Sequence, residues 1–328
     1  MMILILYLVA KKEVVGKLSA FITACFLCDD SRGGTFELRK IGIFGVFFVS
    51  TLALAACGDG DDNGDAGGDN GGDGGGIVSV GVANEEPYGY IDVENNEVTG
   101  AAPEIARAVL QSIGYEDIEG TVNDFGALIE GVNSGSFEMA TAAMDVQPQR
   151  CDAGNFGDIE IQYGEGIVVQ SGNPLNLNSY EDIVDNPDVT VAVMSGANQI
   201  GMLEDLGIDS GQFMQGSSIA DNIAAVENGS ADVMVATDAT ANSAAQNNES
   251  GQVEFVEDFE QPIIDGEPVT AYGAAVFADD ELREAYNEGL QELIESGELL
   301  TIIEEFGFTE ANLPPDDITT EDRCNMDS

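Results

Sequence analysis

The chain of 328 residues is strongly acidic, with 61 Asp and Glu residues against 10 Lys and Arg and no His. From Cys57 onward the imbalance grows, because 57 of the acids but only four arginines lie there. Such a surface repels polyanions, which excludes nucleic acid as a partner, and it is typical of halophilic proteins whose self-repulsion is screened by salt. A disordered acidic tail is excluded as well, since 44% of the residues are hydrophobic.

An export signal precedes the acidic part of the chain. Residues 39–57, RKIGIFGVFFVSTLALAAC, begin with two basic residues, continue in an apolar run too short to favour a stable membrane span, and end in small residues before Cys57. We interpret 1–56 as the signal peptide region, with 1–37 as an extension upstream of the true start. The ending Leu54-Ala55-Ala56-Cys57 is similar to the lipobox of bacterial lipoproteins, in which the cysteine is lipidated and becomes the first mature residue. An uncleaved membrane anchor is the alternative.

A tether of Gly and Asp follows, from the lipidation site Cys57 to residue 76. Its residues 58–76 include no apolar side chain larger than alanine. Such a sequence buries nothing and predicts a solvated linker. Residues 59–64 match the first half of a calcium-loop pattern, but Asn70 stands where that pattern has its bidentate glutamate. We expect no metal site, although the sequence leaves cation binding by the tether open.

The folded part begins at Ile77 with an alternation of strands and helices. Residues 77–91 read as a buried strand that ends in a polar turn, and a helix with Pro103 at its first position is expected to stop at Gly114. The next segments read as strand, helix and strand, at 118–125, 126–136 and 137–146. This order predicts a mostly parallel sheet covered by helices.

The alternation repeats after a break. Strands are expected at 189–196, 211–216 and 231–239, helices at 198–207 and 218–230, and two final helices at 279–307. The segments 166–174 and 270–280 connect the two sets. We therefore predict an α/β fold of two lobes, one comprising 77–167 and 272–328 and the other 168–271, with a hinge of two crossover strands and a ligand cleft between the lobes.

Several motifs resemble the solute-binding proteins of polar amino acid ABC transporters, family 3. They are ANEEPYGY at 83–90, VTGAAPEIARAVL at 98–110, FGALIEGVNSGSFEMATAAM at 125–144 and QPQR at 147–150. Longer motifs, such as SGNPLNLNSYEDI at 171–183 and EFGFTEANLPPDDITTEDRC at 305–324, are similar to the ectoine and hydroxyectoine binders of that family.

This resemblance implies a type II periplasmic-binding-protein-like fold and a monomeric, extracytoplasmic lipoprotein that binds a small zwitterionic solute without a cofactor. The resemblance implies that this solute is ectoine or hydroxyectoine and that the protein delivers it to an ABC permease. A polar or cationic amino acid is the alternative ligand.

Arg150 is the candidate for the carboxylate of the solute. Its planar guanidinium matches a carboxylate, and few cations compete for that role in this chain. The resemblance implies the same, because the arginine of the family at this place grips the ligand carboxylate. An ion pair with one of the many acids is the alternative.

The resemblance assigns the cationic end of the solute to the same lobe. Glu85 matches the acidic position of the ectoine binders, and Tyr88 and Phe125 match two of three aromatic positions that enclose the amidinium ring by cation–π contact. At the third position this chain has Asp145, which would pair with the amidinium or signal another cationic or hydroxylated ligand. Ordinary packing of the aromatic residues and a solvated rim position for Asp145 are the alternatives.

The second lobe is expected to close on the solute with backbone and short polar groups. Ser195, Gly196, Ala197 and Asn198 follow a predicted strand and open a helix, where free N–H groups suit an anion. The family uses this turn for the carboxylate. Thr237 stands where amino acid binders often carry an aspartate for the α-amino group, which favours a solute without a free ammonium.

A disulfide between Cys151 and Cys324 is expected. With Cys25 and Cys28 upstream of the expected start and Cys57 lipidated, these two cysteines remain in an exported domain, and the ectoine binders have cysteines at both matching places. The bridge would hold the C-terminal tail against the lobe that carries Arg150. Two free thiols are the alternative.

Two other classes of protein fit less well. Some relatives of this fold are dehydratases or lyases, but this chain has no His, and paired carboxylates are expected by chance in so acidic a sequence. A sensing module is the other class, and no signalling domain follows residue 308 in the sequence. We therefore expect a binding protein and not an enzyme.

Overall fold

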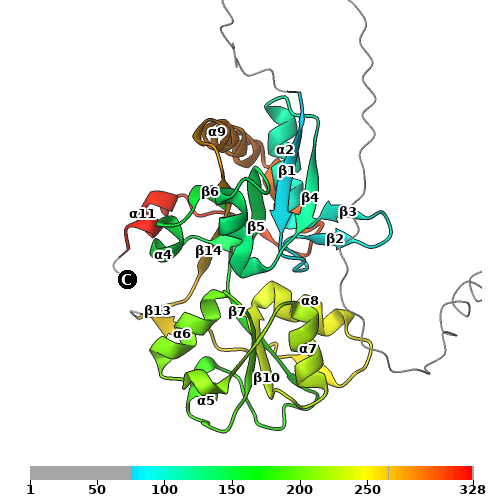
Figure 1. The fold of residues 1–328 in the computed structure, drawn as a ribbon. Helices are drawn as coiled ribbons and strands as arrows, with labels where there is room; N and C mark the ends of the chain where they lie inside the picture. Colours follow the sequence, from blue (N-terminus) through cyan, green and yellow to red (C-terminus); the bar gives the residue numbers. More distant parts are fainter. Residues whose placement is uncertain (1–74, 265, 327–328) are drawn as a thin grey trace, which may run out of the picture. The chain divides into compact units, whose positions relative to one another are not determined.

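Two five-stranded sheets organise the part of the chain that the computed structural model describes, residues 75–264 and 266–326 (Figure 1). The expected signal region 1–56, the lipidation site Cys57 and the tether up to residue 74 lie outside the described residues. Within the described ranges, no helix has both the length and the apolar character needed to cross a bilayer.

The first lobe comprises 75–163 and 271–326 and is built on a sheet of strand order β4-β1-β5-β14-β6. Its strands are β1 (Ile77–Val82), β4 (Asp117–Val122), β5 (Met139–Asp145), β6 (Asn155–Tyr163) and β14 (Ala271–Phe277), with a small hairpin of β2 (Tyr90–Asp92) and β3 (Glu97–Thr99). Its helices are α2 (Ala101–Ser112), η2 (Phe125–Ala127), α3 (Leu128–Asn133), α4 (Pro148–Cys151), α9 (Asp280–Ser296), α10 (Glu298–Glu304), η4 (Glu310–Asn312) and α11 (Thr320–Cys324).

The second lobe comprises 165–268 and is built on a sheet of strand order β11-β7-β10-β8-β9. Its strands are β7 (Glu165–Gln170), β8 (Val191–Met194), β9 (Phe213–Gly216), β10 (Val233–Thr237) and β11 (Val253–Phe255), with a hairpin of β12 (Ile263–Ile264) and β13 (Glu267–Pro268). Its helices are α5 (Tyr180–Val184), α6 (Asn198–Leu206), η3 (Ser210–Gln212), α7 (Ile219–Glu227) and α8 (Asp238–Asn247).

Each sheet has four strands in one direction and one strand against them. In the first sheet β14 runs antiparallel to its neighbours β5 and β6, while β4, β1 and β5 are parallel. In the second sheet β7 runs antiparallel to β10 and β11, while β10, β8 and β9 are parallel. The opposed strand is in both cases the one by which the chain arrives from the other lobe.

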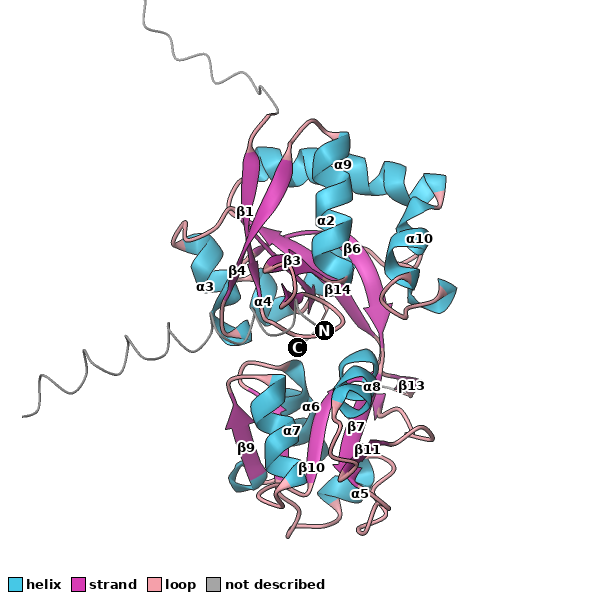
Figure 2. Cartoon of the chain, turned by 90° about the vertical axis from the view of Figure 1, so that its right-hand side faces the viewer, coloured by secondary structure: helices cyan, strands magenta, loops and turns pink. Residues whose placement is uncertain are grey.

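Both faces of each sheet are buried, as expected for sheets covered by helices on both sides. In the first lobe α2, α9 and α10 pack over one face (Figure 2), and α3 covers the other face. Val80, Ile105 and Leu290 belong to one apolar cluster there. In the second lobe the alternate residues Ile167 and Val168 of β7 belong to different apolar clusters. Each lobe therefore has its own apolar core.

The predicted elements are present, with shifted ends. Helix α2 begins at Ala101, so Pro103 is its third residue and not its first. The backbone N–H groups of Ala101 and Ala102 donate to the carbonyls of Pro87 and Tyr88, at 3.0 and 2.9 Å, which extends the helix toward its N-terminus. Gly114 follows the helix with a φ of 104°, a conformation that favours glycine. The same bonds hold the loop that carries Tyr88.

The chain crosses between the sheets at Gly164, which lies between the last residue of β6 and the first of β7. Residues 165–167, expected in the first lobe, pair with β10 and so belong to the second sheet. The side-chain amide of Gln261 brackets this crossing: it accepts from the N–H of Glu165 and donates to its carbonyl, both at 2.8 Å. Because Gln261 lies on the returning segment, the two crossings are tied together.

The expected disulfide between Cys151 and Cys324 is present, with the Cα atoms 5.7 Å apart. It joins α4 to α11, which are far apart in sequence. Helix α11 has no buried residue, so the tail is held by this bond and by a few polar contacts. One of these is the bond of 2.7 Å from the Thr320 hydroxyl to the carbonyl of Gly157.

Candidate functional site

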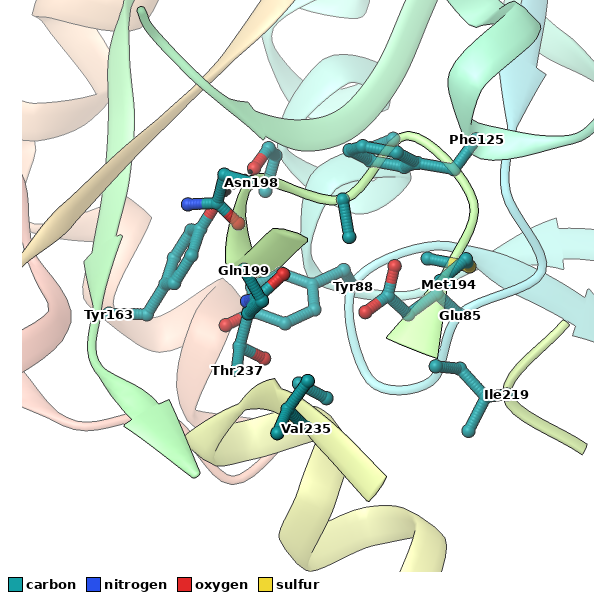
Figure 3. A pocket seen from close by; sticks show the side chains of 14 residues that line it. Glu85, Tyr88, Phe125, Tyr163, Met194, Asn198, Gln199, Ile219, Val235 and Thr237 are labelled. Carbon is teal, nitrogen blue, oxygen red and sulfur yellow. Dashed lines mark hydrogen bonds between the residues drawn. The ribbon is translucent and has the colours of Figure 1, made fainter. Parts of the chain in front are cut away.

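A pocket lies between the two lobes, at the ends of strands from both sheets (Figure 3). Its cavity volume in this structure is about 30 Å³, so the lining side chains stand close together. The first lobe contributes Glu85, Tyr88, Phe125, Ala142, Ala143 and Tyr163. The second lobe contributes Met194, Ala197, Asn198, Gln199, Ile219, Val235, Ala236 and Thr237.

Glu85 is the acidic group of the pocket. It lies in the loop after β1, where its backbone forms two hydrogen bonds with Gly89, at 2.8 and 2.9 Å. Its side chain is buried, and its Oε1 accepts a bond of 2.8 Å from the Thr240 hydroxyl of the other lobe. Burial raises the pKa of Glu85 to about 7, although the bond from Thr240 favours the charged form. Near pH 7 the group is therefore poised between its neutral and charged forms, and a cation in the pocket would favour the carboxylate.

Aromatic rings surround the same space. The ring of Tyr88 packs against those of Tyr163 and Phe308, with centroids 5.1 and 5.3 Å away. The Tyr163 hydroxyl donates to the carbonyl of Ala143 at 2.8 Å, which fixes that ring. The buried Tyr88 hydroxyl has no hydrogen-bond partner among the described residues. A buried polar atom of this kind is one that a bound molecule could satisfy.

Arg150 stands beside the pocket and not among the residues that line it. Its Nη1 donates to the carbonyl of Asp145 at 2.9 Å, and its Nη2 donates to the carbonyl of Gly196 in the other lobe at 3.0 Å. The guanidinium lies over the ring of Phe125, with 5.3 Å between Cζ and the ring centroid. Because Phe125 does line the pocket, one side chain separates the guanidinium from it.

Asp145 also lies outside the pocket lining, and its oxygens already have protein partners. Oδ1 accepts from the N–H of Tyr272 at 2.9 Å, and Oδ2 accepts from Gln147 at 2.8 Å and from Asn198 at 3.1 Å. Burial raises the pKa of Asp145, against the effect of these bonds and of the arginines nearby. In this arrangement the aspartate does not occupy the place of a third aromatic wall.

The turn of the second lobe approaches the first lobe closely. Gly196 has a φ of 82°, and a Cβ there would lie 2.7 Å from the Cα of Gly126. Ala197 then caps α6, and the side chain of Asn198 at its first position reaches Asp145. Ser195 lies before the turn and does not line the pocket. Glycine at 196 is thus needed both for the backbone conformation and for the contact between lobes.

Thr237 links the second sheet to Glu85. Its hydroxyl caps α8 by accepting from the N–H of Thr240 at 3.2 Å. That cap sets the position of Thr240, whose hydroxyl donates to Glu85. Thr237 is buried and lines the pocket.

Sequence reasoning missed two polar residues of the pocket and one behind it. Tyr163 is the last residue before the crossing at Gly164, and Gln199 is the second residue of α6, directly after the predicted turn 195–198. Behind Gln199, the buried Glu165 accepts from its amide and from the Tyr180 hydroxyl, both at 2.8 Å. Burial raises the pKa of Glu165 to about 8.

Comparison with known proteins identifies the family. Residues 78–310 match the bacterial extracellular solute-binding proteins, family 3. The chain is also 34% identical over 255 residues to the Sinorhizobium fredii protein "Probable amino-acid ABC transporter periplasmic-binding protein y4tE", with 76% of this chain and 83% of that relative covered. The chain belongs to this family. It is accordingly an extracytoplasmic solute-binding protein of an ABC transporter, and the resemblance drawn from its motifs is confirmed.

Solved structures agree with this assignment. The chain is similar to EhuB in complex with hydroxyectoine, with 27% identity, a TM-score of 0.69, and 76% of this chain and 95% of that one covered. It is also similar to an ancestral arginine-binding protein bound to arginine, with 26% identity, a TM-score of 0.59, and 70% and 97% covered. These likenesses and the two sheets confirm the predicted two-lobed type II fold.

Proposed function

We propose that this family 3 protein binds ectoine or hydroxyectoine in the pocket between its lobes and delivers it to an ABC permease, anchored to the membrane through lipidated Cys57. The observation that carries the proposal is the buried carboxyl of Glu85 beside the rings of Tyr88 and Tyr163. A delocalised cation is stabilised both by a carboxylate and by aromatic faces. The likeness to EhuB, whose structure contains hydroxyectoine, supports the same ligand class.

The carboxylate of such a solute has donors within reach. The guanidinium of Arg150 lies against Phe125, and its Nη2 is bound to the carbonyl of Gly196, a neutral acceptor that a carboxylate could replace. We assign Arg150 to the ligand carboxylate on these grounds. Gly196, Ala197 and Asn198 offer backbone and amide groups from the other lobe, and Thr237 completes that side.

A polar or cationic amino acid is the second candidate ligand. An ancestral arginine-binding protein is about as similar in sequence as EhuB, and two buried carboxyl groups, Glu85 and Glu165, lie at or behind the pocket. The aromatic rings would then pack on the aliphatic part of the amino acid. Thr237 in place of an aspartate argues against a free α-amino group.

Calorimetry on the full chain in molar salt separates these ligands. We expect binding of ectoine and hydroxyectoine, and weaker or no binding of glycine betaine, arginine and glutamine. The variant Glu85→Gln should weaken binding about a hundredfold, whereas Glu86→Gln, the same change at the exposed neighbouring residue, should leave it within about twofold. Binding of an amino acid alone would replace the first ligand class by the second, and no loss in Glu85→Gln would contradict both.

A further inference from the structure

The C-terminal helix brings an arginine to the buried Asp145. The Nη2 atom of Arg323 lies 3.8 Å from Oδ1 of Asp145, and the two side chains are only 16% and 4% exposed. The guanidinium also lies over the ring of Tyr272, 4.9 Å from its centroid. Arg283, by comparison, pairs within the described residues with two acids that are about three-quarters exposed. Desolvation makes the pair of Arg323 and Asp145 the stronger interaction of the two, and its loss the more disruptive.

Helix α11 contributes little else to the first lobe. It has five residues and none of them is buried. It is nevertheless fixed in place by the disulfide from Cys324 to Cys151, the neighbour of Arg150, and by the bond from Thr320 to Gly157. A segment that buries no core residue yet is covalently attached is suited to presenting a side chain, and Arg323 directly precedes the disulfide cysteine.

Asp145 carries the effect of Arg323 to the other lobe. Its Oδ2 accepts from the side chain of Asn198 at 3.1 Å, across the cleft. Its backbone carbonyl accepts from Arg150, which also bonds to Gly196. Apart from the two arginines, the partners of the Asp145 carboxylate are neutral amides, which do not balance a buried charge. Without Arg323 the carboxylate would lose the only cation that its own oxygens contact among the described residues.

We infer that Arg323 is a positioning residue for closure of the cleft: as the countercharge of Asp145, it holds that carboxylate where it binds Asn198 and so keeps the two lobes together. The tail α11 thereby acts on affinity although it does not line the pocket. The inference rests on the proposed function, because closure matters only if the cleft holds a solute.

The test compares Arg323→Gln with Arg283→Gln, which changes the net charge equally on the same lobe, in the full chain with hydroxyectoine as the probe. Calorimetry gives Kd and stopped-flow fluorescence gives the two rate constants. We expect Arg323→Gln to raise Kd about tenfold through faster dissociation, with association within about twofold, because the contacts that are lost form on closure. Arg323→Lys keeps the charge and should recover most of the affinity. Equal Kd values for Arg323→Gln and Arg283→Gln would overturn the inference.

A double-mutant cycle with Asp145→Asn tests the route of the effect. If Arg323 acts through Asp145, the glutamine substitution should change Kd less than about twofold in the Asp145→Asn background. If the two substitutions instead change Kd independently, so that their separate factors multiply, Arg323 acts by a route other than Asp145. Should Arg323→Gln fail to fold, Asp145→Asn is measured alone with Arg323 in place: faster dissociation of hydroxyectoine supports the route through Asp145, and an unchanged dissociation rate contradicts it.

A measurement without solute keeps the inference separate from the proposed function. Fluorescent labels on the exposed residues Glu119 and Glu249 report the distance between lobes in each variant. If the unmodified chain does not bind hydroxyectoine, that result contradicts the proposed ligand but not the inference. The inference would then stand if Arg323→Gln separates the labels and Arg283→Gln does not, and it would fail if both leave the distance unchanged.

Discussion

The two lobes share a plan but differ in charge and in covalent support. In both sheets the arriving strand, β14 or β7, is the second strand from one edge. All four arginines of the described residues lie in the first lobe, whereas 165–268 contains 19 acidic residues and no basic one. The disulfide also lies wholly in the first lobe. Closure of the cleft therefore brings together two acidic lobes, and the arginines that bridge them come from the first lobe.

The contributions to the pocket follow the same division. The first lobe supplies the carboxyl of Glu85 and the aromatic rings, held by the N-terminus of α2 and by the bond from Tyr163 to Ala143. The second lobe supplies amides, a hydroxyl and aliphatic side chains. We take this to mean that the first lobe recognises the solute and that the second lobe encloses it.

Removal of the disulfide should have the largest effect on stability. Replacing both Cys151 and Cys324 by alanine opens a loop of 173 residues and should lower the free energy of unfolding by about 3 kcal/mol, and by about 5 kcal/mol at most. Hydrogen exchange should show lost protection in α4 and α11, with the second lobe unchanged, because 165–268 has no cysteine. The unmodified chain after reduction serves as the control. Equal loss in both lobes would contradict the local role of the bridge.

Substitution of the bridging arginine should affect binding more than folding. Arg150→Ala removes the bond to the carbonyl of Gly196 and the proposed partner of the ligand carboxylate. We expect a loss in affinity of about a hundredfold or more, close to 3 kcal/mol, with little change in Tm. Arg107→Ala is the control, since Arg107 pairs with Glu104 and Asp117 away from the cleft. A change within about threefold for Arg150→Ala would show that another group takes the carboxylate.

Each lobe has one buried glutamate bonded to a tyrosine, which allows a direct comparison of pH effects. Glu160 accepts from Tyr286 in the first lobe, as Glu165 accepts from Tyr180 in the second. Burial raises both pKa values to about 8, from an ordinary value of 4.5. The folded state thus holds more protons than the unfolded state between these values. The stability from each group is fully present below pH 4.5 and is lost as the pH rises through about 8.

Replacement of either glutamate by glutamine should therefore flatten the pH dependence of Tm. At pH 9 each variant should exceed the unmodified chain by roughly 1–3 kcal/mol of unfolding free energy, and the advantage should shrink toward pH 5. Only Glu165→Gln should also alter solute affinity, because Gln199 of the pocket bonds to Glu165. Parallel pH profiles in variants and unmodified chain would show that neither carboxyl titrates as described.

Salt should have the smallest of these effects. Screening of the 57 acids from Cys57 onward should raise Tm by roughly 4 °C or more between 0.1 M and 2 M NaCl, about 1–2 kcal/mol. The second lobe, which has no basic residue, should gain the most protection against hydrogen exchange. Sucrose is the control for preferential exclusion. The charge explanation fails if sucrose gives the same rise or if Tm does not respond to salt.

The sequence predicts elements whose signals are local and misses arrangements that depend on distant segments. Apolar periodicity and Gly114 define α2 and the strands around it, and Glu85, Tyr88 and Phe125 do line the pocket. Helix α8 went unpredicted, because its apolar face consists of alanines with weak periodicity. The places of Arg150 and Asp145 depend on carbonyls and amides from Gly196, Asn198 and Tyr272. Only the folded arrangement of three separate segments brings these groups together.

The place of β14 in the first sheet determines the order in which the lobes can be completed during synthesis. All five strands of the second sheet lie between residues 165 and 255 in one continuous stretch. In the described part of the first sheet, β6 pairs with β14 alone, which ends at Phe277, and Cys151 can form its disulfide only once Cys324 has been synthesised. The first lobe, whose synthesis begins first, is therefore the last to be completed. By then the second lobe can already have folded.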